Sequence, residues 1–219
     1  STATLTRNRI FDNVAEKGGG IGLNHAQNVT LQGTQIQSNV SATDGGGLTV
    51  DDSDVTMTNT MITDNFASFD GAGVYVANGS ARFLHATLAR NRGHQGIALE
   101  GGATWLVNSI LVSHTVGIEA SGASTATLDT TLWGAGAWAN LTDTVEAGGG
   151  VVITSGDLRG DPAFVAPGVG DYHITQASAA FDAGVDAGAT IDVDGDPRPL
   201  MGGYDVGADE ILGCLVRLN

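Results

Sequence analysis

Lysine, cysteine and long apolar runs are nearly missing from this 219-residue chain. Lys17 is the only lysine, and 9 basic residues face 24 acidic ones, which gives a net charge of −15. Because such a surface repels phosphate backbones, nucleic acid is not an expected partner. The chain has no run of 18 apolar residues, so we expect no transmembrane span. Cys214 stands alone, which excludes a disulfide within the chain.

The chain is instead rich in glycine, with 33 residues, and in repeats. Six units each begin with an apolar residue, at spacings of 26, 26, 26, 23 and 22 residues. These residues are Leu5, Leu31, Met57, Phe83, Leu106 and Leu128. Apolar residues alternate at period two within each unit, as in Val74-Tyr75-Val76, which is typical of short strands.

A unit of this length holds about three short strands and three turns. Stacked units pair each strand with its copy in the next coil, so we expect an all-β, single-stranded parallel β-helix of about six coils over residues 1–156. Inward residues should stack from coil to coil. We expect Leu31, Ile36, Leu48 and Val50 to lie on Met57, Ile62, Val74 and Val76.

An asparagine recurs eight residues after the first position of the early units. The members of this column are Asn13, Asn39, Asn65 and Asn91. Equivalent asparagine side chains can hydrogen-bond along a stack of parallel strands. We therefore interpret the column as a structural ladder and not as a binding site.

The repeats also carry family-like motifs. Phe11-Asp12-Asn13, followed by Gly18-Gly19-Gly20-Ile21, resembles the paired motifs of chlamydial polymorphic outer-membrane proteins. Residues 1–156 are similar to the repeats of bacterial right-handed β-helix proteins. This resemblance implies a right-handed helix.

The composition changes near residue 157. All four prolines lie beyond it, at Pro162, Pro167, Pro197 and Pro199, together with eleven of the 24 acidic residues. Glycine, proline and aspartate mark turns, so residues 157–219 should form an acidic, loop-rich cap or wrap. Because an open coil end exposes strand edges, we expect this segment to cover the last coil or to run back along the helix.

The same region contains a series of ordered motifs. Asp161–Phe164, Gly170–His173, Phe181–Gly184, Asp192–Arg198 and Tyr204–Glu210 follow one another in that order. They resemble the end of secreted bacterial β-helix proteins of the choice-of-anchor Q type. The resemblance implies an exported protein located outside the cell or on the surface of a bacterium, and a chain that is part of a longer protein.

Asp192, Asp194 and Asp196 place three carboxylates on alternate residues around a glycine. Calcium binds six to eight oxygens, and short acidic turns can supply several of them. The sequence therefore suggests a calcium site. A turn stabilised by aspartate side chains before Pro197, with Arg198 pairing to one of them, explains the same residues.

A catalytic interpretation rests on Arg82, Arg90, Asp64 and Asp70. Polysaccharide lyases with a β-helix fold combine carboxylate-bound calcium with a basic residue that removes a proton from the sugar. The alignment of columns places Asp64 beside Arg90 in the next coil. The simpler interpretation is a surface ion pair, which contributes less than about 1 kcal/mol.

A binding interpretation rests on Tyr75 and Trp105, which alternate with inward neighbours and should point outward. Exposed aromatic rings stack on sugars. We therefore expect a non-catalytic surface module for display or for binding a glycan or protein, with a calcium-assisted lyase or related glycan-active enzyme as the alternative. Thr4, Thr6, Thr56 and Thr58 resemble the threonine arrays of ice-binding β-helices, which is a third interpretation.

Overall fold

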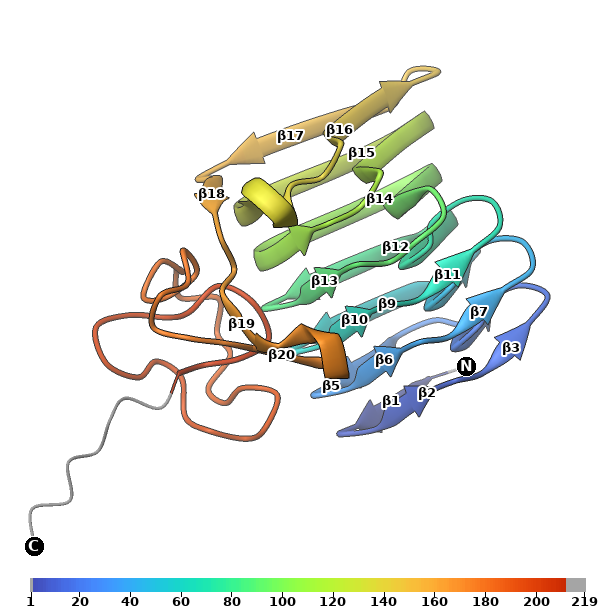
Figure 1. Ribbon diagram of the computed structural model, residues 1–219. Helices are drawn as coiled ribbons and strands as arrows, with labels where there is room; N and C mark the ends of the chain where they lie inside the picture. The colour runs from blue at the N-terminus through green and yellow to red at the C-terminus, as the bar shows by residue number, and fades with distance from the viewer. Residues whose placement is uncertain (1, 212–219) are drawn as a thin grey trace, which may run out of the picture.

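The computed structural model describes residues 2–211 and shows an all-β parallel solenoid of about six turns (Figure 1). Every pairing between solenoid strands is parallel. The predicted fold class is therefore confirmed. Cys214 lies outside the described residues.

Each coil has three faces, here called first, second and third. The first face contains β4 (Ile21–Asn24), β8 (Leu48–Asp51), β16 (Thr142–Ala147) and the starts of β12 (Val74–Leu84), β14 (Gln95–Val112) and β15 (Val116–Gly134). The second contains β1 (Ala3–Thr6), β5 (Val29–Gln32), β9 (Asp54–Thr58), β17 (Val151–Ser155) and the later parts of β12, β14 and β15.

The third face contains β2 (Arg9–Phe11), β6 (Gln35–Gln37), β10 (Met61–Thr63), β13 (Thr87–Ala89), β18 (Leu158–Gly160) and the ends of β14 and β15. A small sheet of β3 (Val14–Ala15), β7 (Val40–Ser41) and β11 (Phe66–Ala67) links the third face to the first face of the next coil. Solenoid pairing thus extends to Gly160.

The corners between faces require a left-handed backbone. The corner before the third face has positive φ at Arg7, Gly33, Asn59, His85, Asn108, Thr130 and Gly156. Asparagine and glycine tolerate this conformation best, which explains their abundance. Gly47 has a different role, since a Cβ there would lie 2.7 Å from the carbonyl oxygen of Gly73 in the next coil.

The core consists of stacked apolar ladders. Leu31 is in register with Met57, Ile36 with Ile62, Leu48 with Val74, and Val50 with Val76. All eight side chains are fully buried. The stacking expected from the repeat spacing is therefore confirmed.

The asparagine column forms a continuous chain of hydrogen bonds. The side-chain amides of Asn13, Asn39 and Asn65 each donate to Oδ1 of the next asparagine, at 2.9, 3.0 and 3.0 Å. Asn91 donates to Nε2 of His114 at 3.2 Å, and Nδ1 of His114 lies 3.2 Å from Oδ1 of Asn140. The histidine thus continues the column.

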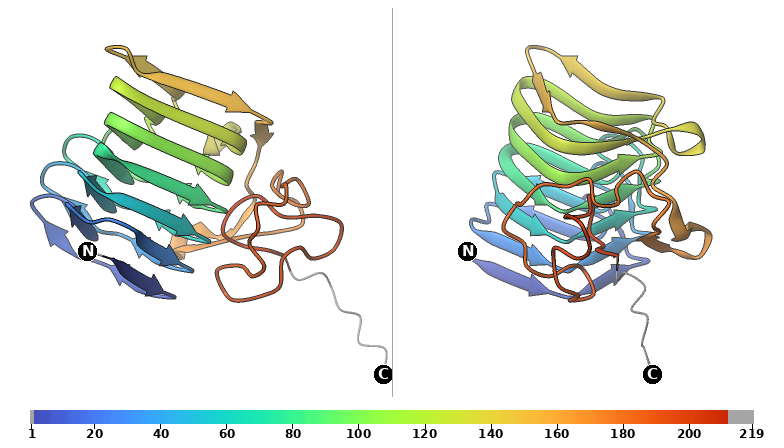
Figure 2. Two further views of the ribbon diagram at one scale, coloured as in Figure 1. Left: turned by 180° about the vertical axis from the view of Figure 1, so that it is seen from behind. Right: turned by 90° about the vertical axis from the view of Figure 1, so that its left-hand side faces the viewer.

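Residues 161–211, here called the C-terminal segment, run back along the third face (Figure 2). The segment begins with an antiparallel pair, β19 (Phe164–Ala166) and β20 (Asp171–Ile174), joined by the 3-10 turn η2 (Pro167–Val169). Its apolar residues pack against outward-facing residues of the third face. These solenoid residues are Met61, Ala89, Ile110, Val112 and Leu132.

The last coil is left uncovered by the described part of the chain. Of the two alternatives for the C-terminal segment, the structure shows the one that runs back along the helix. Within residues 2–211, β16 and β17 pair only with β15, and Val151 and Ile153 are exposed. The other helical element, η1 (Gly136–Trp138), is a single 3-10 turn. Among these residues, no helix has the length and apolarity needed to cross a membrane.

Candidate functional site

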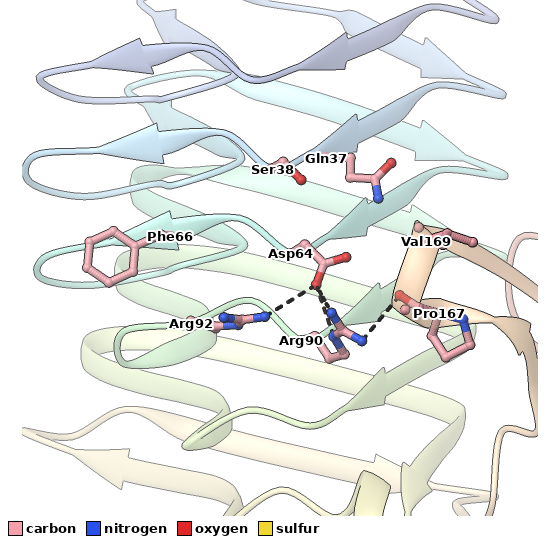
Figure 3. Close-up of a pocket in the computed structure, with 10 residues that line it drawn as sticks. Gln37, Ser38, Asp64, Phe66, Arg90, Arg92, Pro167 and Val169 are labelled. Atoms are coloured by element: carbon pink, nitrogen blue, oxygen red, sulfur yellow. Dashed lines mark hydrogen bonds and ion pairs between the residues drawn. The ribbon is translucent and has the colours of Figure 1, made fainter.

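A depression lined by two of the predicted catalytic residues, Asp64 and Arg90, lies between the third face and η2 (Figure 3). Its volume is about 440 Å³. Asp64 and Arg90 occupy equivalent corners of successive coils, as the column alignment predicts, and both have a left-handed backbone. Gln37, Phe66 and Arg92 complete the wall on the solenoid side.

Arg90 uses its guanidinium to hold the C-terminal segment in place. Its Nε and Nη2 atoms lie 2.9 and 2.8 Å from Oδ1 of Asp64, and Nη1 donates to the carbonyl of Pro167 at 3.2 Å. The other oxygen of Asp64 accepts the hydroxyl hydrogen of Tyr172 at 2.6 Å. Burial and this bond to Asp64 raise the pKa of Tyr172, so the phenol stays neutral. These contacts give the ion pair a docking role.

Arg92 is the more accessible base in this depression. Its side chain is 70% exposed and only approaches Asp64, at 4.0 Å. Phe66 next to it is 41% exposed. The other two catalytic candidates lie elsewhere, since Arg82 is on the second face and Asp70 precedes the first face. The structure therefore brings together Asp64 and Arg90 but not the predicted set of four.

A second groove, of about 230 Å³, crosses the second face at Trp105. Trp105 points outward and is 38% exposed, as the alternation predicts. The guanidinium carbon of Arg82, its neighbour in the adjacent strand, lies 5.8 Å from the centre of the indole ring. Polar side chains line the rest of the groove. They are Asn28, Thr30, Asp54, Thr56 and Ser80.

Tyr75 is outward-facing but buried, which corrects the expectation of an exposed ring. It is 7% exposed, and its hydroxyl donates to Glu100 at 2.5 Å. The ammonium of Lys17 lies 5.1 Å from the ring centre. Burial and then the bond to Glu100 raise the pKa of Tyr75. Long neighbouring side chains thus remove this ring from the accessible surface.

The threonine array of the second face is short. Thr4, Thr30 and Thr56 are in register in successive strands. Arg82 and Trp105 occupy the next two positions of the same column. A flat threonine lattice therefore stops where the Trp105 groove begins.

Asp192 acts as an acceptor for backbone amides. Its Oδ1 takes the N–H groups of Asp194, Gly195 and Asp196 at 2.9, 2.8 and 2.8 Å. Its Oδ2 takes the N–H of Glu210 at 3.1 Å. Four backbone donors thus engage a carboxylate that the sequence suggested as a calcium ligand, and the loop has the contacts of an aspartate turn.

Asp194 instead lies beside His173 and Asp209. One possible ligand atom from each residue falls within 4.8 Å of the other two. Nε2 of His173 is 2.8 Å from Asp194, and its Nδ1 is 2.6 Å from Asp171. Burial opposes a charged ring, but the hydrogen bond to Asp171 and the nearby carboxylates outweigh burial and raise the pKa of His173.

The buried carboxylate of this group is Asp209. Burial raises its pKa to about 6, although the N–H of Ile174 donates to it at 2.8 Å. An imidazole with two carboxylates is a donor set that suits zinc and other transition metals, whereas calcium prefers oxygen alone. The spacing of the three aspartates could not reveal this arrangement, because His173 and Asp209 come from other loops.

The sequence analysis missed one functional column, the corner residues Asn59, His85 and Asn108. They are buried and contact the C-terminal segment. The sequence does contain a pattern that indicates this contact. Polar residues recur at the corner before the third strand, and outward-facing apolar residues such as Met61 and Ile110 follow them.

Comparison with known proteins gives one match. A family model described as "Right handed beta helix region" matches residues 1–132. No curated protein and no solved structure matches the chain.

Proposed function

The chain belongs to the right-handed β-helix family, and from this we propose that it is a non-catalytic module that binds a glycan on the second face. The observation that supports the proposal best is Trp105, an exposed indole in a groove lined by hydroxyl, carboxylate and guanidinium groups. Aromatic faces pack against the apolar faces of sugar rings, while polar groups at the edge bond to the sugar hydroxyls.

The groove is suited to a neutral sugar. Asp54 already accepts the hydroxyl hydrogen of Ser80 at 2.5 Å, and Arg82 lies close to the indole ring. Thr30 and Thr56 present hydroxyls from adjacent strands of a rigid sheet. Such a preformed site loses little conformational entropy on binding. A short stretch of neutral pyranose units along the solenoid axis would contact these groups in turn.

A lyase has less support from the same structure. Nε and Nη1 of Arg90 already donate hydrogen bonds, and Nη2 forms an ion pair with Oδ1 of Asp64. The other oxygen of Asp64 accepts from Tyr172. A base that removes a proton from a sugar must be free to reach it. We therefore assign Asp64 and Arg90 to docking of the C-terminal segment.

We also propose that the module works outside the cell or on the surface of a bacterium, where glycans are exposed. The support is the resemblance of Asp192–Arg198 and Tyr204–Glu210 to exported β-helix proteins. A divalent cation, suggested by the sequence, would use Asp194 together with His173 and Asp209.

Isothermal titration calorimetry against a panel of neutral and acidic oligosaccharides tests the function. We expect binding to a neutral member, with Trp105→Ala weakening it at least tenfold. Phe69→Ala removes another exposed aromatic ring, away from the groove, and should leave affinity unchanged. Binding that survives Trp105→Ala, or no binding to any member, contradicts the proposal. An increase in unsaturated product when calcium is added to acidic polysaccharides would favour the lyase.

A further inference from the structure

The corner residues Asn59, His85 and Asn108 form a row of side chains that holds the C-terminal segment by its backbone. The amide of Asn59 donates to the carbonyl of Ile191 at 2.6 Å. Asn108 makes a pair of bonds to Val185, donating to its carbonyl at 2.6 Å and accepting its N–H at 2.9 Å. Three successive coils thus bind the segment through one column.

His85 lies between these two asparagines and is fully buried. Its Nε2 is 3.2 Å from the amide nitrogen of Asn108. The orientation of that amide is fixed by its two bonds to Val185, so the amide donates and Nε2 must accept. The ring hydrogen therefore sits on Nδ1, which is 3.3 Å from the carbonyl of Asp205 and donates to it. A neutral imidazole with its hydrogen on Nδ1 thus suits both Asn108 and the carbonyl of Asp205.

The charged groups facing His85 come from the C-terminal segment. Nη1 of Arg198 lies 3.1 Å from Nδ1, and it donates to the carbonyl of Asp205 at 3.0 Å and to Glu210 at 2.8 Å. The Asp205 carboxylate is occupied by backbone N–H groups. Asp186 contributes a more distant negative charge, and the ring of Tyr204 lies 6.0 Å away. From the solenoid, His85 faces the neutral amide of Asn108.

We propose that His85 is an acid-sensitive latch, and that protonation of its imidazole releases residues 185–207 from the third face. The added hydrogen on Nε2 would point at the amide hydrogens of Asn108, and the new positive charge would lie against Arg198. Once the segment undocks, water solvates the ring, and the unfavourable contacts of the protonated imidazole with the Asn108 amide and with Arg198 are relieved. Protons therefore favour the released state.

The ionisation behaviour agrees with this geometry. Burial, followed by the charge of Arg198, lowers the pKa of His85 from 6.5 to about 3. A base with a lower pKa in the docked state binds more protons when released, so docking weakens as the pH falls below about 6.5. The docking equilibrium should decline by about 25-fold in total between pH 7 and pH 5, and the slope approaches about tenfold per pH unit only well below 6.5. Burial raises the pKa of Asp205 and Glu210, which has the opposite sign and favours docking in acid.

Replacing His85 by asparagine separates the effect of His85 protonation from that of the carboxylates. Asparagine accepts the left-handed corner, as Asn59 and Asn108 do. Its oxygen can accept from Asn108 and its amide can donate to the carbonyl of Asp205, without a titrating group. The carboxylates and His114 are unchanged, so they contribute equally to both proteins.

Amide hydrogen exchange between pH 7 and pH 5, expressed as protection factors, measures docking. Over this pH range we expect protection at Val206 and Gly207 to fall by about 25-fold more in the wild type than in His85→Asn. Amides of the core strand β8 should keep their protection in both proteins. Equal pH slopes in the two proteins, or simultaneous loss of protection in β8 and in the C-terminal segment, overturn the proposal.

A second measurement needs no variant. Nitrogen-15 shifts of the wild-type imidazole should report a neutral ring with its hydrogen on Nδ1 at pH 7. While residues 185–207 remain protected, the ring should not titrate near 6.5. A ring that titrates there with the segment still docked contradicts the latch, even if His85→Asn does not fold.

Discussion

Oδ1 of Asn65 accepts two hydrogen bonds from Asn39, one from the backbone N–H at 2.9 Å and one from the side-chain amide at 3.0 Å. The amide of Asn65 in turn donates to the carbonyl of Ile36 at 2.9 Å and to Asn91 at 3.0 Å. One asparagine thus satisfies polar groups of both neighbouring coils.

Asn65→Leu should lower the free energy of unfolding by about 1–3 kcal/mol, because both donors of Asn39 and the carbonyl of Ile36 lose buried partners. Leucine has a similar volume, so the loss reports hydrogen bonding and not a cavity. Urea titration measures it. Asn13→Leu, at the exposed end of the ladder, is the matched control and should cost less. If both variants unfold at the same urea concentration as the wild type, the asparagines contribute only their preference for the turn conformation.

His114 makes stability depend on pH. Burial lowers its pKa from 6.5 to about 4. The unfolded chain therefore binds the proton more readily, and stability falls as the pH drops from about 6.5 towards 4, by up to about 3 kcal/mol. His114→Asn should flatten this dependence, since asparagine continues the ladder between Asn91 and Asn140. Melting temperatures at pH 5 and pH 7.5 provide the test, and an unchanged difference between them would show that the ring does not titrate as described.

The ion pair of Arg198 with Glu210 is fully buried, at 2.8 Å. Glu210→Gln removes the carboxylate that pairs directly with the buried guanidinium and should lower the stability of the C-terminal segment by about 3–5 kcal/mol. Asp51→Asn, which breaks the exposed pair with Lys17, should cost less than about 1 kcal/mol. The stability losses of the two variants can be compared by chemical denaturation, monitored through hydrogen exchange of the amides of the C-terminal segment. Similar small losses would show that the buried pair adds no more than a surface pair.

Divalent cations should act through Asp194 and not through Asp192. Zinc, and more weakly calcium, should raise the melting temperature, and a chelator should reverse the effect. Asp194→Asn should abolish the response with little effect on the metal-free protein. Asp192→Asn should lower stability with or without metal, because an amide nitrogen replaces an acceptor of N–H groups. A melting temperature indifferent to both metals removes the proposed site.

Sequence periodicity predicted the solenoid because each ladder position is sampled several times, as Leu31 and Met57 illustrate. It could not place the C-terminal segment, which occurs once and docks through contacts such as Tyr172 with Asp64. Met61 could have indicated the docking site, because an apolar residue at an outward position of a strand is expected to be covered by another part of the protein.

Predicting the site residues was harder than predicting the fold. Period-two alternation correctly gave outward directions for both Tyr75 and Trp105, but exposure depends on the neighbouring columns. Lys17 and Glu100 cover Tyr75, whereas short threonines leave Trp105 open. For Asp192, the spacing of carboxylates says nothing about which backbone N–H groups converge on each oxygen.

The path of the C-terminal segment has a mechanical consequence. In a plain stack, each coil touches only its neighbours, so the ends can fray one coil at a time. Here one stretch of chain is fastened to Asn59, Thr87 and Asn108, which belong to three successive coils. The segment therefore acts as a splint. The coils that it contacts should unfold together in one cooperative step. The coils beyond it, including β16 and β17, can unfold one at a time.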